Sequence, residues 1–236
     1  MLSPSNFLLL FLITMLPTFL PTSSLLPRTL SSLRRPFTLN TKPYTVGING
    51  YICSGKSTFS NFLAKKPGVK YINADRLATY PNGSTAYTSI INAFGTDIID
   101  DKGEIDRIKL GSIVFSSTSS MSKLESIIWP ECEIKIDEIM GGCDGGVVLL
   151  EAAVLDKAGW DRKYCDITVT LKSSEGLRVK RLVERNEMSE NEAKMRVEGQ
   201  RGKVKEGEVL VVNDGGREEL EEEVERIWMG IMEEIN

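Results

Sequence analysis

Residues 44–66 read YTVGINGYICSGKSTFSNFLAKK, and this stretch decides the fold. The mostly apolar run 44–48 predicts a short buried strand. Residues 50–57 fit the pattern G-x-x-x-x-G-K-[ST] at every fixed position. The apolar residues within 58–66 then recur at helical spacing. A strand, a glycine-containing loop and a helix in this order predict a phosphate-binding loop (P-loop).

The residue types of this loop suit a phosphate ligand. Gly50 and Gly55 can adopt backbone conformations that are costly for other residues, so successive N–H groups can point at an anion. The helix N-terminus adds free N–H groups and its dipole. Lys56 is expected to reach the β- and γ-phosphates of a nucleoside triphosphate, and the Ser57 hydroxyl to ligate Mg²⁺. The structural alternative is a glycine turn that binds nothing. The predicted ATP-binding residues in this stretch are Gly50, Tyr51, Ile52, Cys53, Ser54, Gly55, Lys56, Ser57 and Thr58.

Two acidic residues follow predicted strands further along the chain. Asp75 comes after the strand predicted at 69–72, and Glu151 closes the apolar run 147–150. Residues at the carboxyl ends of parallel strands face the ligand crevice of an open sheet. Asp75 is therefore predicted to accept the proton of an attacking hydroxyl or to hold Mg²⁺ through water. Its structural alternative is to cap a helix that begins near residue 76. Glu151 is predicted to support Mg²⁺, as a Walker B carboxylate does.

The remaining pattern predicts an α/β fold. Residues 167–171 and 209–212 supply two further strands, which gives five strands in a βαβ-type order and a parallel sheet. Residues 189–192 read as a capping box, so a helix should begin there. The last predicted helix has an apolar stripe at helical spacing: Leu220, Val224, Ile227, Trp228, Ile231 and Ile235.

Composition excludes several kinds of chemistry. The 236 residues include no histidine, so a Ser-His-Asp triad, a histidine base and a His-ligated zinc are all excluded. The four cysteines never occur at C-x-x-C spacing, and we expect four reduced thiols. Beyond residue 40 the chain has 26 basic and 33 acidic residues, a net charge of −7. A chain of this charge is a poor nonspecific nucleic-acid binder, so no nucleic-acid partner is predicted.

Residues 1–42 predict a targeting segment. The apolar run 7–16 is too short to span a bilayer, so no stable membrane span is expected in the mature form. Residues 22–41 are rich in Ser, Thr, Leu and Arg and contain no acid, as organellar transit peptides do. The predicted destination is a mitochondrion, a plastid or the secretory route. The alternative is a leader with no targeting role on a cytoplasmic protein.

Over about residues 44–236 the chain resembles the dephospho-CoA kinase family. The residues that carry the resemblance lie in five segments: 50–58, 73–75, 93–100, 105–115 and 127–130. Residues 151–160 (EAAVLDKAGW) and Trp129 are closer to the kinase half of the eukaryotic bifunctional CoA synthase. The adenylyltransferase half of that enzyme has no counterpart in this chain.

The resemblance implies a three-layer nucleotide-kinase-like fold in a domain over residues 43–236. A helical insertion at about 76–140 would bind the acceptor, and a lid would lie at about 178–205. The implied reaction is transfer of the ATP γ-phosphate to the ribose 3′-hydroxyl of dephospho-CoA, the last step of CoA biosynthesis, with ATP and Mg²⁺ as cofactors. The lid segment holds nine basic and five acidic residues, which suits closure over a tetra-anion.

The resemblance also implies roles for individual residues. Asp75 would be the base, and Arg185, with Arg181 behind it, would neutralise the transferring phosphoryl group. Tyr87 and Arg107 would contact the acceptor. The turn that contains Asn213 would contact adenine, with a plain turn as its structural alternative.

Three departures from the family pattern leave alternatives open. Asn73 stands in place of an acid, Glu151 in place of an aspartate, and Lys157 where a glutamate is common. The alternatives are another small-molecule kinase of the same fold, or a nucleotide-binding regulator with weakened activity. The sequence makes no prediction of oligomeric state.

Overall fold

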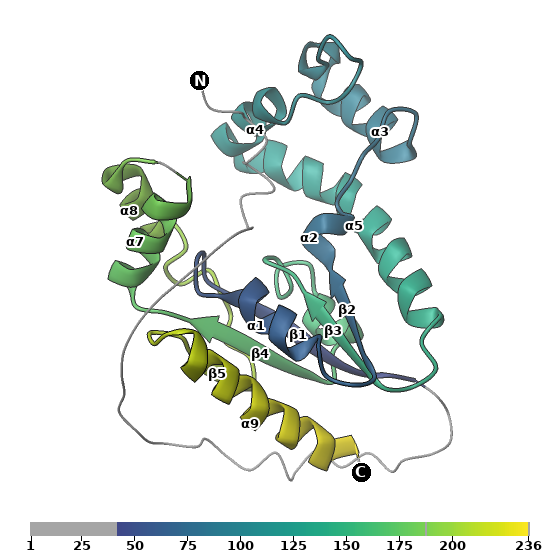
Figure 1. Ribbon diagram of the computed structural model, residues 1–236. Coiled ribbons are helices and arrows are strands. Elements are labelled where there is room, and N and C mark those ends of the chain that lie inside the picture. Colours follow the sequence, from purple (N-terminus) through teal and green to yellow (C-terminus); the bar gives the residue numbers. More distant parts are fainter. Residues whose placement is uncertain (1–41, 187, 236) are drawn as a thin grey trace. The chain divides into compact units, whose positions relative to one another are not determined.

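The computed structural model describes residues 42–186 and 188–235. These residues form two compact units (Figure 1). A helical unit comprises residues 73–142, and a sheet unit comprises residues 42–72 and 143–235. The predicted targeting segment, apart from residue 42, lies outside the described residues. Within them, no helix is both long enough and apolar enough to cross a membrane.

The sheet has five strands, each within two residues of its predicted bounds. They are β1 (Tyr44–Gly50), β2 (Val69–Asn73), β3 (Val147–Glu151), β4 (Ile167–Lys172) and β5 (Val209–Val212). Their order in the sheet is β2-β3-β1-β4-β5. β1 is central and pairs in parallel with β3 and β4, and β4 pairs in parallel with β5. The prediction of an α/β fold on a five-stranded parallel sheet is confirmed.

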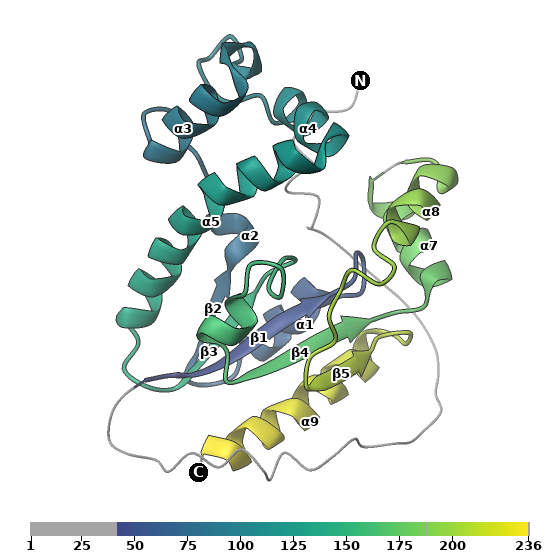
Figure 2. The same cartoon turned by 180° about the vertical axis from the view of Figure 1, so that it is seen from behind.

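Alternation along the strands gives the sheet two different faces. Val46 and Ile48 of β1, with Val169 of β4, point into a core shared with α1 (Lys56–Leu63) and α9 (Arg217–Ile235). Gly47 points to the other face, where an added Cβ would meet the Cys165 sulfur at 2.6 Å. The short helix α6 (Trp160–Tyr164) packs against β1. Figures 1 and 2 show α1 and α9 on one side of the sheet and α6 on the other, which gives the sheet unit three layers.

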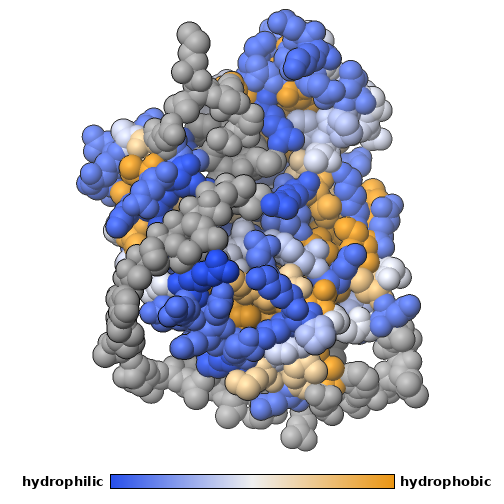
Figure 3. Space-filling model, viewed as in Figure 1, coloured by the Kyte–Doolittle hydropathy of each residue, from blue (hydrophilic) through white to orange (hydrophobic). Residues whose placement is uncertain are grey.

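The helices of the sheet unit follow the sequence pattern closely. α1 ends at Leu63, three residues before the predicted end. The predicted capping box is present, because the Ser189 side chain accepts from the Glu192 amide at the start of α8 (Glu190–Glu198). α8 packs against α7 (Glu175–Asn186), and both lie in the predicted lid segment. α9 buries its predicted apolar stripe, while its acidic side faces outward as a hydrophilic surface (Figure 3).

The helical unit is built from four helices and one 3₁₀ turn. These are α2 (Ala74–Leu77), α3 (Thr85–Phe94), η2 (Thr96–Ile98), α4 (Arg107–Ser116) and α5 (Thr118–Gly141). Its own core includes Ile90, Leu110 and Ile136, each at most 1% exposed. Pro130 lies inside α5, where it removes one helical hydrogen bond, and both views of the chain show α5 bent near its middle.

Candidate active site

The P-loop joins the end of β1 to the start of α1 with the backbone that the glycines allow. Gly50 has a φ of +144° and Gly55 a φ of +96°, so both adopt conformations that L-residues avoid. An added Cβ at Gly55 would also lie 2.2 Å from Nδ2 of Asn213. Cys53 is the one non-glycine residue with positive φ (+55°) in the described part of the chain. The loop therefore has several residues with positive φ, a conformation in which successive backbone N–H groups can point at one anion.

Lys56 is buried beneath this loop. Its side chain is 3% exposed, and its Nζ donates to the carbonyl oxygens of Gly50 and Tyr51, at 2.9 Å each. An ammonium is almost never buried without such partners. The loop's own backbone thus holds the lysine charge against the P-loop.

A buried carboxylate faces the first turn of α1. Glu151 is 1% exposed and ends β3. Its Oε1 accepts from the Ser57 hydroxyl at 2.7 Å, and its Oε2 accepts from the Tyr71 hydroxyl at 2.5 Å. The structure thus brings together the two residues predicted to hold Mg²⁺. Oxygen atoms of this kind are the ligands that Mg²⁺ prefers.

Three arginines of α7 approach the P-loop from the lid segment. Arg178, Arg181 and Arg185 are spaced by three and four residues, so they share one helix face. The Arg178 guanidinium lies over the ring of Tyr51, 4.8 Å from its centroid. Arg181 donates to the carbonyl oxygen of Cys53 at 3.3 Å. The charge of Arg185 lies close enough to the Cys53 thiol for the two groups to influence each other's pKa. α7 therefore directs three cations at one loop.

Two of these arginines keep unused donors. Nη1 of Arg178 and Nε of Arg185 are buried and have no hydrogen-bond partner among the described residues. Burial lowers the pKa of Arg178, Arg181 and Arg185, although arginine stays protonated near neutral pH. Burial also raises the pKa of the Cys53 thiol, and the charges of Arg185 and Lys56 offset this in part. Buried guanidinium groups with unmet donors indicate an anion ligand at this place.

A residue just beyond α8 contacts the same loop. Oε1 of Gln200 accepts from the amide of Ile52 at 2.6 Å. Ile52 is part of the predicted phosphate nest, and Gln200 lies two residues beyond α8. The lid segment therefore contacts the P-loop through a neutral side chain as well as through its arginines.

Asn213 supports the loop from the side of β5. It is 6% exposed, and its Nδ2 donates to the carbonyl oxygen of Ser54 at 2.9 Å. Its own carbonyl oxygen accepts from the Ser173 hydroxyl at 2.6 Å and from Arg181 at 3.2 Å. The side-chain amide is thus used to hold the P-loop, and the contact of this turn with adenine stays a prediction.

Asp75 lies in the first turn of α2, two residues after β2 ends. The suggestion that it caps this helix is wrong. The helix begins at Ala74, and its cap is Asn73, whose side-chain oxygen accepts from the Arg76 amide at 3.1 Å. Asn73 is the cap because its carboxamide stands just before the helix, where an oxygen acceptor can reach the third amide.

The two predicted acceptor-binding residues both lie in the helical unit. The Tyr87 hydroxyl, on α3, donates to the carbonyl oxygen of Gly103 at 2.6 Å. Arg107 opens α4, and its guanidinium lies 5.1 Å from the centre of the Tyr80 ring. Their contact with an acceptor stays a prediction.

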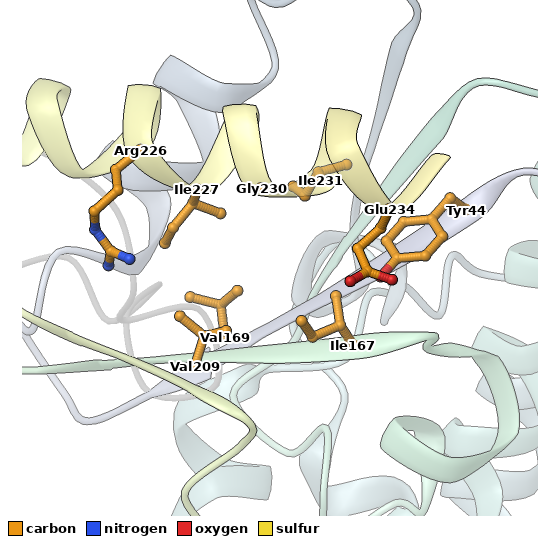
Figure 4. A pocket seen from close by; sticks show the side chains of 9 residues that line it. All are labelled: Tyr44, Ile167, Val169, Val209, Arg226, Ile227, Gly230, Ile231 and Glu234. Atoms are coloured by element: carbon orange, nitrogen blue, oxygen red, sulfur yellow. The ribbon is translucent and has the colours of Figure 1, made fainter. Parts of the chain in front are cut away.

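Two cavities lie away from the P-loop. One, of about 40 Å³, is an apolar gap between α9 and the sheet, lined by Ile167, Val169 and Ile227 among others (Figure 4). The other, of about 240 Å³, is polar and lies beside β4, with Asp161 and Lys205 in its lining. Neither is lined by the P-loop. The candidate active site is therefore identified by the hydrogen-bond donors and charged side chains around the P-loop, and not by a cavity.

The sequence alone did not indicate four residues that the structure brings to this site. Tyr71 resembles an ordinary strand residue, and Gln200 follows a helix with no motif around it. Arg178 belongs to a basic run that usually marks a solvated helix face. Ser173 simply follows β4. Helical spacing from Arg181 and Arg185 is the one signal that could have found Arg178.

Comparison with known proteins agrees with this geometry. The family model of dephospho-CoA kinase matches residues 44–219. The dephospho-CoA kinase of Geobacter sulfurreducens is 35% identical over 192 residues, which cover 78% of this chain and 96% of that protein. The dephospho-CoA kinase of Arabidopsis thaliana is 34% identical over 194 residues, 79% of this chain and 83% of the relative.

Solved structures share the fold. The crystal structure of TT1252 from Thermus thermophilus has a TM-score of 0.65 and 25% identity, and the match covers 79% of this chain and 97% of that one. A dephospho-CoA kinase from Campylobacter jejuni has a TM-score of 0.56 and 23% identity, with coverage of 79% and 96%. The P-loop, the buried Lys56 and the extent of the family match together lead to one conclusion: this chain belongs to the dephospho-CoA kinase family.

Proposed function

We propose that this chain transfers the γ-phosphate of ATP to the ribose 3′-hydroxyl of dephospho-CoA. The observation that carries the proposal is the charge arrangement at the P-loop. Lys56 and three arginines of α7 converge on one loop, and two of the arginines keep buried donors without partners. A triphosphate supplies the acceptor oxygens and the negative charge that these donors lack.

The chain's own residues divide the work of phosphoryl transfer. The P-loop amides and Lys56 bind the phosphates, and Arg185, assisted by Arg181, stabilises the negative charge of the transferring group. Asp75 accepts the proton of the 3′-hydroxyl while the oxygen of that hydroxyl forms a bond to the γ-phosphorus. The bond from that phosphorus to the β–γ bridging oxygen breaks, and ADP leaves.

Ser57 and Glu151 are the residues that would hold Mg²⁺. The hydroxyl oxygen of Ser57 would ligate the ion through a lone pair while its proton stays hydrogen-bonded to Glu151, as the 2.7 Å contact allows. The described residues contain no cluster of three or more acidic or thiol ligands, which suits a site completed by phosphate oxygens and water. When bound, Mg²⁺ neutralises charge on the β- and γ-phosphates.

The two compact units receive separate roles. The helical unit, residues 73–142, is proposed to bind the acceptor, because Tyr87 and Arg107 lie in it. The segment of α7 and α8 is proposed to close over ATP, because it carries the arginines that contact the P-loop. The proposed small-molecule partners are ATP and dephospho-CoA. We also propose that residues 1–42 direct the chain to an organelle or to the secretory route.

A variant of the base tests the proposal. Asp75→Asn keeps the shape of the side chain and removes its capacity to accept a proton. We expect kcat with dephospho-CoA to fall by about 100-fold or more, with ATP affinity unchanged. Asp137→Asn, an exposed position on α5 in the same unit, is the matched control and should keep full activity. Full turnover by Asp75→Asn would contradict the proposed role of this aspartate.

A further inference from the structure

Both oxygens of the Glu151 carboxylate are fixed by hydroxyl groups from different elements. The Ser57 hydroxyl comes from the first turn of α1 and the Tyr71 hydroxyl from the middle of β2. β2 is the strand next to β3 in the sheet, so the tyrosine is presented by a neighbouring strand. Since Glu151 is 1% exposed, these donors replace the water that the carboxylate would otherwise bind.

We propose that Tyr71 is a positioning residue for the Mg²⁺ site, acting through Glu151. The phenolic hydroxyl holds Oε2, and this leaves Oε1 directed at the Ser57 hydroxyl. The inference rests on the proposed function, because it assigns Tyr71 to the metal that supports phosphoryl transfer. Partners of this kind orient the groups around a metal without touching it.

The length of the side chain explains why a second hydroxyl matters. Glutamate has one more rotatable bond than aspartate, so more conformations must be frozen before its carboxylate occupies one place. A tyrosine on a strand has a rigid ring and a single hydroxyl at a fixed reach. At 2.5 Å the contact is a short hydrogen bond to a charged acceptor, the class that holds geometry most firmly.

The contact between Tyr71 and Glu151 depends on the length of the glutamate side chain. An aspartate at position 151 would withdraw the carboxylate by about one carbon–carbon bond, roughly 1.5 Å. From there it could not keep both the 2.7 Å contact with Ser57 and the 2.5 Å contact with Tyr71. The two contacts that fix the carboxylate therefore depend on the length of the glutamate side chain.

The test compares ATP binding with and without the metal. The full chain carrying Tyr71→Phe loses one hydroxyl and keeps the ring. ATP affinity is measured by titration calorimetry in Mg²⁺ and again in EDTA. We expect the gain in affinity that Mg²⁺ gives to shrink about tenfold, with the affinity in EDTA unchanged. Tyr44→Phe is the matched control, because Tyr44 begins β1 at the end away from the P-loop, and it should behave as wild type.

A second variant shows whether Tyr71 acts through Glu151. Glu151→Gln should reduce the same metal-dependent gain, and adding Tyr71→Phe should reduce it no further, because two residues of one unit are not additive. Equal loss of affinity in Mg²⁺ and EDTA would mean that the hydroxyl serves only packing, and would overturn the proposal. The proposal would also be overturned if Tyr71→Phe kept the Mg²⁺ dependence of the wild type, or if the ATP affinity of the wild-type chain were the same with and without Mg²⁺.

The outcome is separable from that of the proposed function. A chain that phosphorylates no dephospho-CoA, yet shows the selective Mg²⁺ effect in Tyr71→Phe, would retain the positioning role and lose the proposed acceptor. A chain that makes CoA, with Tyr71→Phe indistinguishable from wild type in both titrations, would retain the function and lose the positioning role.

Discussion

The hydroxyl of Ser57 donates to the carboxylate of Glu151 at 2.7 Å, which ties the first turn of α1 to the end of β3. The two residues lie 94 positions apart in the chain. Parallel strands make this contact possible, because their carboxyl ends meet at one edge of the sheet. In the β1–β3 pairing Ile48 lies opposite Glu151. The acid therefore lies beside the end of β1, next to the start of the P-loop. Ser57 and Glu151, which would hold Mg²⁺, are therefore already next to each other.

Removal of the Lys56 charge should strongly slow catalysis. Lys56→Met keeps a long unbranched side chain and loses the ammonium that the loop carbonyls hold. We expect kcat/KM for ATP to fall by on the order of 100-fold or more, because the phosphates lose a preorganised cation. Steady-state kinetics measures the effect. Lys65→Met, an exposed lysine just past α1, is the control, and a similar loss in that variant would point to damage of the helix instead.

Arg185 should act mainly in the transition state. Arg185→Gln is expected to lower kcat by on the order of 1000-fold and ATP affinity by a much smaller factor, because most of the charge that Arg185 stabilises develops on the transferring phosphoryl group. Lys180→Gln, an exposed position on α7, should leave kcat unchanged. A variant whose ATP affinity falls while kcat stays the same would place Arg185 in ground-state binding only.

A negative charge at position 200 should repel the nucleotide. Gln200→Glu has nearly the shape of the wild-type side chain but brings a carboxylate to the amide of Ile52. We expect KM for ATP to rise about tenfold or more, and the rise should weaken at high salt, as electrostatic effects do. Asn191→Asp adds the same charge to an exposed site on α8. An unchanged KM in Gln200→Glu would show that the triphosphate binds away from this end of the loop.

Two thiols should resist alkylation in the folded chain. Burial raises the pKa of Cys132 to about 11 and that of Cys165 to about 12. Because the thiolate is the reactive form, at pH 8 only about one molecule in a thousand and one in ten thousand, respectively, is reactive. Iodoacetamide labelling followed by mass spectrometry should modify these residues last, and faster as pH rises. Denatured protein should label at all four cysteines. Rapid labelling of either residue in native protein would contradict the raised pKa of its thiol.

The strands and the P-loop could be predicted because local pattern decides them. An apolar run directly before GYICSGKS predicts a strand followed by a phosphate-binding loop and a helix. The structure has β1 and α1 at these places. The cap of α2 was predicted wrongly because Asn73 and Asp75 are both good capping residues, and only the helix start distinguishes them. Sequence spacing sets helix bounds to within a turn, which is too coarse to make that choice.

The contacts around the P-loop could be predicted only in part. Ser57 and Glu151 are expected from motifs, whereas Tyr71 enters the site because β2 lies beside β3. Strand order is a property of the whole sheet, so no local pattern reports it. Arg178 was hidden for another reason. It is 4% exposed although it lies in a charged segment, and its contact with the Tyr51 ring is a tertiary contact that composition does not report.

The most direct test is the identity of the product. The full chain, incubated with Mg²⁺-ATP and dephospho-CoA, should consume one ATP for each CoA formed, and NMR should place the new phosphate on the ribose 3′-oxygen. Lys56→Met should form CoA at least about 100-fold more slowly. A wild-type chain that binds ATP tightly but returns dephospho-CoA unchanged, or places the phosphate on another oxygen, would contradict the account.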